Sequence, residues 1–196
     1  MREIRIILIL IVGGLSIYMA YQSQYHISPF DEIIWAILWI TSISLFIWSL
    51  LTDITSYKTD KSLNCFFSTV LCLACVLVTI GLEIKKDREF NKPSLLNIFY
   101  DGSYNGRGID FKMDGRYILD EMAIGFIDYS YGTYTISNNK ITLNPPYKKG
   151  SQDIISHMLI LGGEEGSGLF AVETDSLGNI LNERIKYRVT VDNRGK

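Results

Sequence analysis

The sequence predicts two or three transmembrane α-helices followed by an all-β domain that forms a small eight-stranded antiparallel barrel. Two observations support this prediction. Most acidic and basic residues lie after Leu82 or in short connectors, and three long apolar runs precede that point. From Ser94 onward, short segments of alternating apolar and polar residues are separated by Gly, Asn, Asp and Pro, a pattern typical of antiparallel β-structure. A chain of 196 residues has room for one ordinary domain beside the helices.

The membrane part, residues 1–82, contains three apolar runs. A hydrocarbon core of about 30 Å needs about 20 apolar residues, so the first run is at the lower limit and the other two are long enough to span. The first run lacks the small-x-small cleavage site of a signal peptide, and we expect it to be retained as a helix. The polar connector 52–62 makes a helical hairpin of the other two. The candidate spans are 6–21, 33–51 and 63–82.

Small residues in these runs suggest where the helices pack together. Gly13 and Gly14 lie in the centre of the first run and would allow a second helix to approach closely. Cys65, Cys72 and Cys75 are spaced to share one face of the third helix, where we expect them to act as small packing residues. The sequence predicts no disulfide framework.

The basic residues do not define an orientation if all three runs span the membrane. The positive-inside rule then compares equal numbers on the two sides. If the first helix is interfacial or re-entrant, the bias favours a cytoplasmic C-terminal domain. Residues 83–93 are predicted to form a charged stalk that extends the third helix into water. The two groups are Arg2, Arg5, Lys58 and Lys61 on one side, and Lys85, Lys86, Arg88 and Lys92 on the other.

The aqueous part, residues 94–196, contains eight predicted strands. The segments MDGR (113–116) and SNNK (137–140) are typical of tight hairpin turns, because Asp, Asn and Gly tolerate positive φ. Strands at this spacing predict a small barrel or a sandwich. The predicted strands are 95–100, 107–113, 116–122, 131–137, 140–144, 153–161, 168–174 and 184–191.

Alternation along the strands predicts which side chains face the interior. Arg107 has the parity of the apolar residues in its strand, which places it at the mouth of the interior. The residues expected inside are Ile109, Phe111 and Met113 in the second strand, and Ile185, Tyr187, Val189 and Val191 in the last. The residues expected to face water are Asp110, Lys112, Lys186 and Arg188.

Few residues are suited to catalysis or metal binding. There are two histidines, His26 and His157, and the sequence has no His-Glu-x-x-His or Gly-x-Ser-x-Gly motif. Asp120 and Glu121 are adjacent in a strand, so they point to opposite faces and are not an acid/base pair. We expect no enzyme activity, catalytic residue, metal or cofactor. Charges of mixed sign also disfavour duplex nucleic acid as a partner.

A binding module fits the aqueous part better. A small barrel binds one modest ligand at an open end, through a few polar groups on an aromatic wall. Arginine with aromatic rings suits a nucleotide, because guanidinium pairs with phosphate while rings stack on bases. The alternative for each candidate is an ordinary surface arginine or core tyrosine. The candidate ligand-binding residues are Arg107, Arg116, Tyr100, Tyr104, Tyr117, Tyr131 and Tyr134.

Two segments of this domain, YSYGTYTISNNKITLN (129–144) and FKMDGRYIL (111–119), resemble motifs of small lipocalin-like barrels. With the helices and the charged stalk, the layout resembles the transmembrane β-barrel effectors of cyclic-oligonucleotide-based antiphage signalling systems (CBASS), and the related Panoptes-type effector. The resemblance implies a cyclic dinucleotide, made by a partner cyclase, as the activating ligand. It also implies a homo-oligomer that disrupts the bacterial inner membrane and kills the cell, with a cytoplasmic β-domain.

Two other functions remain open from the sequence. A non-enzymatic envelope immunity or accessory protein would hold its barrel in the periplasm and bind a protein partner. A barrel that handles lipids or lipoproteins would need a large dry cavity.

Overall fold

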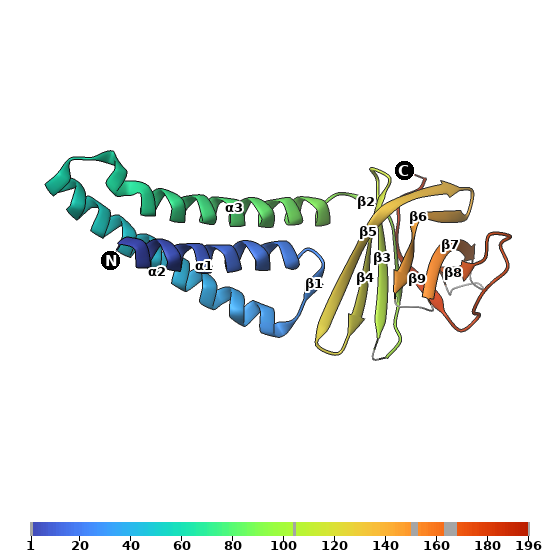
Figure 1. The fold of residues 1–196 in the computed structure, drawn as a ribbon. Coiled ribbons are helices and arrows are strands. Elements are labelled where there is room, and N and C mark those ends of the chain that lie inside the picture. The colour runs from blue at the N-terminus through green and yellow to red at the C-terminus, as the bar shows by residue number, and fades with distance from the viewer. Residues whose placement is uncertain (1, 104, 150–152, 163–167, 196) are drawn as a thin grey trace. The chain divides into compact units, whose positions relative to one another are not determined.

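The computed structural model describes residues 2–103, 105–149, 153–162 and 168–195, and of these the side chains of all but 145–149 and 153–154. The chain divides into two compact units, Met1–Glu89 and Phe90–Lys196. Figure 1 shows the helices of the first and the strands of the second.

Three long helices make up most of the first unit: α1 (Arg2–Gln22), α2 (Pro29–Asp60) and α3 (Phe67–Phe90). A two-residue strand, β1 (His26–Ile27), follows α1, and a short 3-10 helix, η1 (Leu63–Phe66), precedes α3. Within the described residues, three helices are long and apolar enough to cross a membrane, and they include all three predicted spans.

The limits of α2 follow from its end residues. Ser28 is the N-cap, since its hydroxyl accepts from the Asp31 amide while the Asp31 carboxylate accepts from the Ser28 amide, and Pro29 is the first helical residue. The helix ends at Lys61, which has a φ of 50°. The predicted connector 52–62 was therefore too long, because its polar residues continue the helix through Asp60.

The first unit buries polar side chains and exposes large apolar ones. Ile4, Ile11, Ile40 and Leu51 are among the exposed residues. This distribution suits lipid, in which polar groups are costly on the outside and bind one another within the bundle. The buried polar residues are Arg5, Ser16, Ser42, Ser49, Asp53, Ser68, Thr69 and Thr79. The first unit therefore has the character of a membrane-spanning bundle.

Gly13 allows α1 to approach α3 closely, as the sequence predicts. A Cβ atom at Gly13 would lie 2.7 Å from the Cys75 Sγ, whereas one at Gly14 would meet nothing within 4 Å. Cys72 is buried, Cys75 is partly buried, and both thiols are free. Cys65 lies in η1 instead of α3, so the three cysteines do not share one face of a single helix.

Replacing Gly13 with alanine is expected to weaken the packing of α1 on α3 by about 1–3 kcal/mol, the usual cost of overpacking. Gly14→Ala is the matched control and should leave stability unchanged or slightly higher, because alanine favours helix. Both variants can be compared by SDS-induced unfolding of the full chain in mixed micelles. Equal stability of the two would contradict the close approach at Gly13.

Eight strands form the second unit, and each predicted strand is present. Every neighbouring pair is antiparallel, in the order β5-β4-β3-β2-β9-β8-β7-β6, and pairing of β5 with β6 closes the barrel. The predicted closed eight-stranded antiparallel barrel is confirmed. The strands are β2 (Ser94–Tyr100), β3 (Gly106–Lys112), β4 (Arg116–Ala123), β5 (Phe126–Ser137), β6 (Lys140–Lys149), β7 (Asp153–Gly162), β8 (Leu169–Thr174) and β9 (Lys186–Asp192).

Both predicted hairpin turns are present, with Gly115 and Asn138 at positive φ. The barrel interior is filled by a packed apolar core, as expected for eight strands. This packing is unlike the large dry cavity that lipid handling requires. The buried core residues are Leu96, Ile98, Ile109, Phe111, Tyr117, Leu119, Tyr134, Ile141, Leu143, Ile155, Met158, Ile160, Ala171 and Tyr187.

Three predictions of whether a side chain points into the barrel or toward water were wrong. Met113 is exposed because β3 ends at Lys112 and Met113 lies in the turn. Val191 is also exposed, because the pairing of β2 with β9 shifts register beside it. Lys112 was expected in water but is buried, since its Nζ donates to the carbonyl oxygens of Phe90 (2.6 Å) and Lys92 (3.0 Å). Its ammonium also forms an ion pair with the Asp110 carboxylate on the same strand, at 2.6 Å.

Candidate functional site

A cluster of charged and phenolic side chains lies inside one end of the barrel. Arg107 on β3 donates from Nε and Nη2 to one oxygen of Glu121 on β4, at 3.1 and 2.8 Å. Its Nη1 lies 3.4 Å from the Glu173 carboxylate on β8 and 3.3 Å from the Tyr187 hydroxyl on β9. The Tyr187 hydroxyl donates to the same Glu173 oxygen at 2.5 Å. Four strands therefore contribute to one network.

The β3–β4 hairpin brings the first pair together. Its register places Arg107 directly opposite Glu121, Ile109 opposite Leu119, and Phe111 opposite Tyr117. Because side chains alternate along a strand, these opposed pairs share the inward face. The predicted inward position of Arg107 at one end of the barrel is therefore what the structure shows.

The network is largely shielded from water and holds more negative than positive charge. The Arg107 side chain is 15% exposed, and its two carboxylate partners are similarly buried. Among the described residues of the network, one guanidinium faces two carboxylates, which makes a net charge of −1. Burial by itself lowers the pKa of Arg107, but contacts with Tyr187 and Glu121 outweigh burial and raise the pKa above its ordinary value. Arg107 is therefore charged at any ordinary pH.

Tyr100 is the second predicted residue at this end of the barrel. It lies opposite Arg107 in the pairing of β2 with β3, and it is partly buried. Its ring centroid lies 5.8 Å from that of Tyr187. The structure thus brings Arg107 and Tyr100 together. It adds the ring of Tyr187, which was predicted to face the barrel interior but was not a candidate for the site.

Arg116 lies at the other end of β4 and points outward, with a side chain that is 53% exposed and paired with Asp114 at 3.2 Å. The five residue-to-residue steps from Arg116 to Glu121 span about 16 Å of strand, at about 3.3 Å per residue. The structure therefore does not bring the two candidate arginines together within the barrel.

Three other candidate tyrosines, Tyr117, Tyr131 and Tyr134, are separate from the cluster. Tyr117 and Tyr134 belong to the core; the Tyr134 hydroxyl donates to the Lys112 carbonyl oxygen at 2.7 Å. Gly132 leaves room for Tyr117, since a Cβ there would lie 2.5 Å from the ring. Tyr131 is exposed, and its ring lies near that of Phe90. Tyr104 lies outside the described residues.

Glu121 and Glu173 were missed as partners of Arg107. The predicted turn at 113–116, with the parity of Leu119, contained enough information to pair Arg107 with Glu121. Glu173 is 66 residues from Arg107 along the chain and reaches it only because the barrel closes. The described residues include no group of three or more His, Cys, Asp or Glu suited to holding a metal ion.

Buried tyrosines predict a loss of stability at alkaline pH. Burial raises the pKa of Tyr187, Tyr117 and Tyr134 above the ordinary value of about 10. In the unfolded chain these phenols ionise first, so above about pH 10 the unfolded state binds fewer protons and the free energy of unfolding falls. This contribution is fully present below that pH.

We expect part of the tyrosinate absorbance to develop late in an alkaline titration, together with the loss of near-ultraviolet circular dichroism. Tyr187→Phe should remove one late-titrating group. Ionisation of all twelve tyrosines in one early step, with the fold intact, would contradict this expectation.

The structure thus defines a class of protein in which candidate membrane-spanning helices precede a closed eight-stranded β-barrel with a charged cluster at one end. Comparison with protein-family models, curated proteins and solved structures finds no match.

Proposed function

We propose that the protein is a membrane-anchored, non-enzymatic effector whose barrel binds a cyclic dinucleotide and whose helical unit then self-associates and disrupts the inner membrane. One observation carries the proposal: a single chain joins three lipid-compatible helices to a small barrel with an arginine and two tyrosines at one end. The layout resembles that of the CBASS and Panoptes-type effectors, although these effectors are usually described with a simpler helical hairpin. A partner cyclase would supply the ligand, and death of the infected cell would be the antiviral outcome.

Arg107 is the group best suited to meet a phosphate. Among the contacts described above, those of its Nη1 are the longest, at 3.3 and 3.4 Å, and this is the edge at which a stronger acceptor can enter. A phosphate offers guanidinium two oxygens in the geometry of a bidentate pair. Tyr100 and Tyr187 present aromatic rings beside that edge, on which a base can stack.

The carboxylates set a requirement for this binding. Because the network already has a net charge of −1, an anionic ligand has to displace Glu121 or Glu173 from Arg107. That exchange offers a way to couple ligand binding to a change in the barrel. To drive assembly, the ligand must bind the assembled state more tightly than the monomer by a few kcal/mol.

The basic residues support a cytoplasmic barrel. Arg5 is buried in an ion pair with Asp53, so it is not one of the charges at the surface of the bundle. Arg2, Lys58 and Lys61 then remain on that side, against four basic residues between Lys85 and Lys92 on the other. A C-terminal alkaline phosphatase fusion should be inactive, and an active fusion would favour the periplasmic immunity or accessory protein.

Isothermal titration of the full chain in detergent against a panel of cyclic dinucleotides tests the proposal. At least one member should bind, Arg107→Ala should abolish binding, and Glu121→Gln should strengthen it because one competitor of the phosphate is removed. Arg116→Ala is the matched control, and it should bind as the wild type does, since Arg116 lies at the other end of the barrel. Absence of binding by every member of the panel would overturn the proposal.

A further inference from the structure

The interior of the helical bundle contains a charged layer that joins all three helices. Arg5 on α1 pairs with Asp53 on α2 at 2.8 Å and donates to the Ser49 carbonyl oxygen at 3.2 Å. The other Asp53 oxygen accepts from the amide and the hydroxyl of Thr69 on α3, at 3.1 and 2.8 Å. Ionisable groups held inside a membrane bundle commonly mark pathways for ions or protons.

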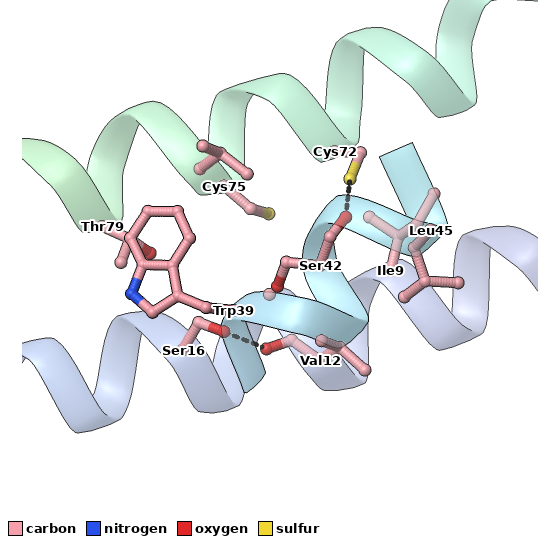
Figure 2. A pocket seen from close by; sticks show the side chains of 11 residues that line it. Ile9, Val12, Ser16, Trp39, Ser42, Leu45, Cys72, Cys75 and Thr79 are labelled. Atoms are coloured by element: carbon pink, nitrogen blue, oxygen red, sulfur yellow. Dashed lines mark hydrogen bonds between the residues drawn. The ribbon is translucent and has the colours of Figure 1, made fainter. Parts of the chain in front are cut away.

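Further along the bundle, a small cavity has a few polar side chains in a largely apolar wall. The cavity has a volume of about 20 Å³ and is lined from all three helices, with Ser16 on α1, Ser42 on α2, and Cys75 and Thr79 on α3 (Figure 2). This volume is enough for one water molecule, which needs about 10–15 Å³. It is too small for a hydrated metal cation.

Three hydroxyls in the bundle interior have no hydrogen-bond partner in the described part of the chain. These buried, unpartnered atoms are the Oγ atoms of Ser49 and Ser68 and the Oγ1 atom of Thr79, and Thr79 also lines the cavity. Other hydroxyls of the bundle are satisfied: Ser16, which also lines the cavity, donates to the Val12 carbonyl oxygen at 2.9 Å, and several exposed hydroxyls donate to the carbonyl oxygen four residues earlier. These exposed hydroxyls are those of Thr41, Ser44, Thr52 and Thr55.

An unsatisfied buried hydroxyl costs free energy that a bound water molecule recovers. The three unpartnered interior hydroxyls are therefore places for water, which the hydroxyls bonded to the backbone do not need.

One apolar layer lies between the charged layer and the hydroxyls of the cavity, and it forms part of the cavity wall. Ile9, Leu45 and Cys72, one from each helix, form a buried cluster with partly buried apolar neighbours. Figure 2 shows these three side chains toward one end of the view and Thr79 toward the other. A narrow apolar ring between polar layers excludes water and closes a pathway by dewetting.

Partly buried polar side chains meet beside the C-terminal ends of α1 and α3. The Ser23 hydroxyl lies 3.4 Å from the Glu83 carboxylate and accepts from Lys86 at 3.3 Å. A pocket of about 130 Å³ within the helical unit adjoins them, and it is also lined by His26, Asp31 and Glu32. Three carboxylates against one lysine suit a cationic species such as a proton.

We propose that the three-helix bundle contains a closed proton pathway that runs from the Arg5–Asp53 layer through the cavity to the Ser23–Glu83 end, with the Ile9–Leu45–Cys72 layer as its gate. When the gate is wet, each water or hydroxyl accepts one proton and passes one on, so no group changes overall. The pathway belongs to a single chain and goes beyond the proposed function, because it needs neither a cyclic dinucleotide nor self-association.

The test uses the full chain in liposomes that contain a trapped pH indicator and a high internal potassium concentration, with no nucleotide present. Valinomycin then sets an inside-negative potential that draws protons inward through any open pathway. Wild type should be nearly closed. Cys72→Ser, which makes the gate polar with little change of size, and Leu45→Ser should each raise the initial rate of internal acidification at least tenfold.

Matched controls separate gate opening from general damage. Leu51→Ser makes the same exchange at a position of α2 that is 61% exposed, and Cys65→Ser makes the conservative exchange outside the gate; both should stay at the wild-type rate. Adding Thr79→Val to Cys72→Ser should return the rate toward that of wild type, because the hydroxyl that holds the cavity water is lost.

Three results would overturn the proposal. A Cys72→Ser rate equal to that of Cys65→Ser would show that the layer is not a gate. Acidification without valinomycin would show that potassium also passes. Release of a trapped dye too large for a proton pathway would show disruption of the bilayer instead. Because no nucleotide is used, a failure here leaves the proposed ligand binding to its own titration.

Discussion

Replacing Arg107 with methionine is expected to lower the unfolding free energy of the barrel by about 3–5 kcal/mol, the usual cost of removing one partner of a buried ion pair. Methionine keeps the apolar length of the side chain but leaves Glu121 and Glu173 buried without their cation. The two carboxylates then repel each other where little water reaches them. The loss should far exceed that caused by replacing an exposed arginine of the same barrel.

Amide hydrogen exchange of the full chain, followed by mass spectrometry of the β-strand peptides, measures this effect separately from the helical unit. The double variant Arg107→Met/Glu121→Gln should be more stable than Arg107→Met alone, because one unpaired carboxylate has been neutralised. Arg116→Met, at an exposed position, should stay within about 0.5 kcal/mol of wild type. A double variant less stable than Arg107→Met would show that the cost does not come from unpaired carboxylates.

Replacing Arg5 with methionine is expected to loosen α1 from the bundle and to lower its stability by about 3–5 kcal/mol. The substitution leaves the Asp53 carboxylate buried with only the Thr69 donors. All three tryptophans lie on α2, so their fluorescence reports on the helical unit during SDS-induced unfolding in mixed micelles.

Two double variants separate charge pairing from simple packing at this site. Arg5→Met/Asp53→Leu removes both charges and should recover most of the lost stability. The exchanged pair Arg5→Asp/Asp53→Arg should recover less, since Thr69 can no longer donate to a carboxylate at position 53. If Arg5→Met alone unfolds as wild type does, the buried pair contributes nothing to holding α1.

The strands and spans could be predicted because they depend on local patterns. Apolar runs of sufficient length and strands of alternating polarity can be recognised without knowing what lies beside them. The eight strands and the turns at Gly115 and Asn138 were predicted on this basis. The limits of α2 were not predicted, because a change from apolar to polar residues after Leu51 does not by itself end a helix, and α2 continues through Asp60.

The candidate site could be predicted only in part from the sequence. Parity correctly placed Arg107 inside and separated Asp120 from Glu121, because alternation is a property of each strand. The same rule failed for Lys112, since the carbonyl oxygens that hold its ammonium come from outside its strand. It also treated Arg107 and Arg116 as one group, although the strand between them keeps them apart.

The sequence by itself determined that this protein has apolar helices of membrane-spanning length and a small antiparallel barrel with Arg107 on the inner face, because these features repeat locally along the chain. Only the tertiary structure decided which charges meet. Glu173 joins Arg107 through closure of the barrel, and Arg5 joins Asp53 through helix packing. Both charge pairs bring together residues far apart in sequence, and their formation depends on how whole elements pack to cover apolar surface and satisfy buried polar groups.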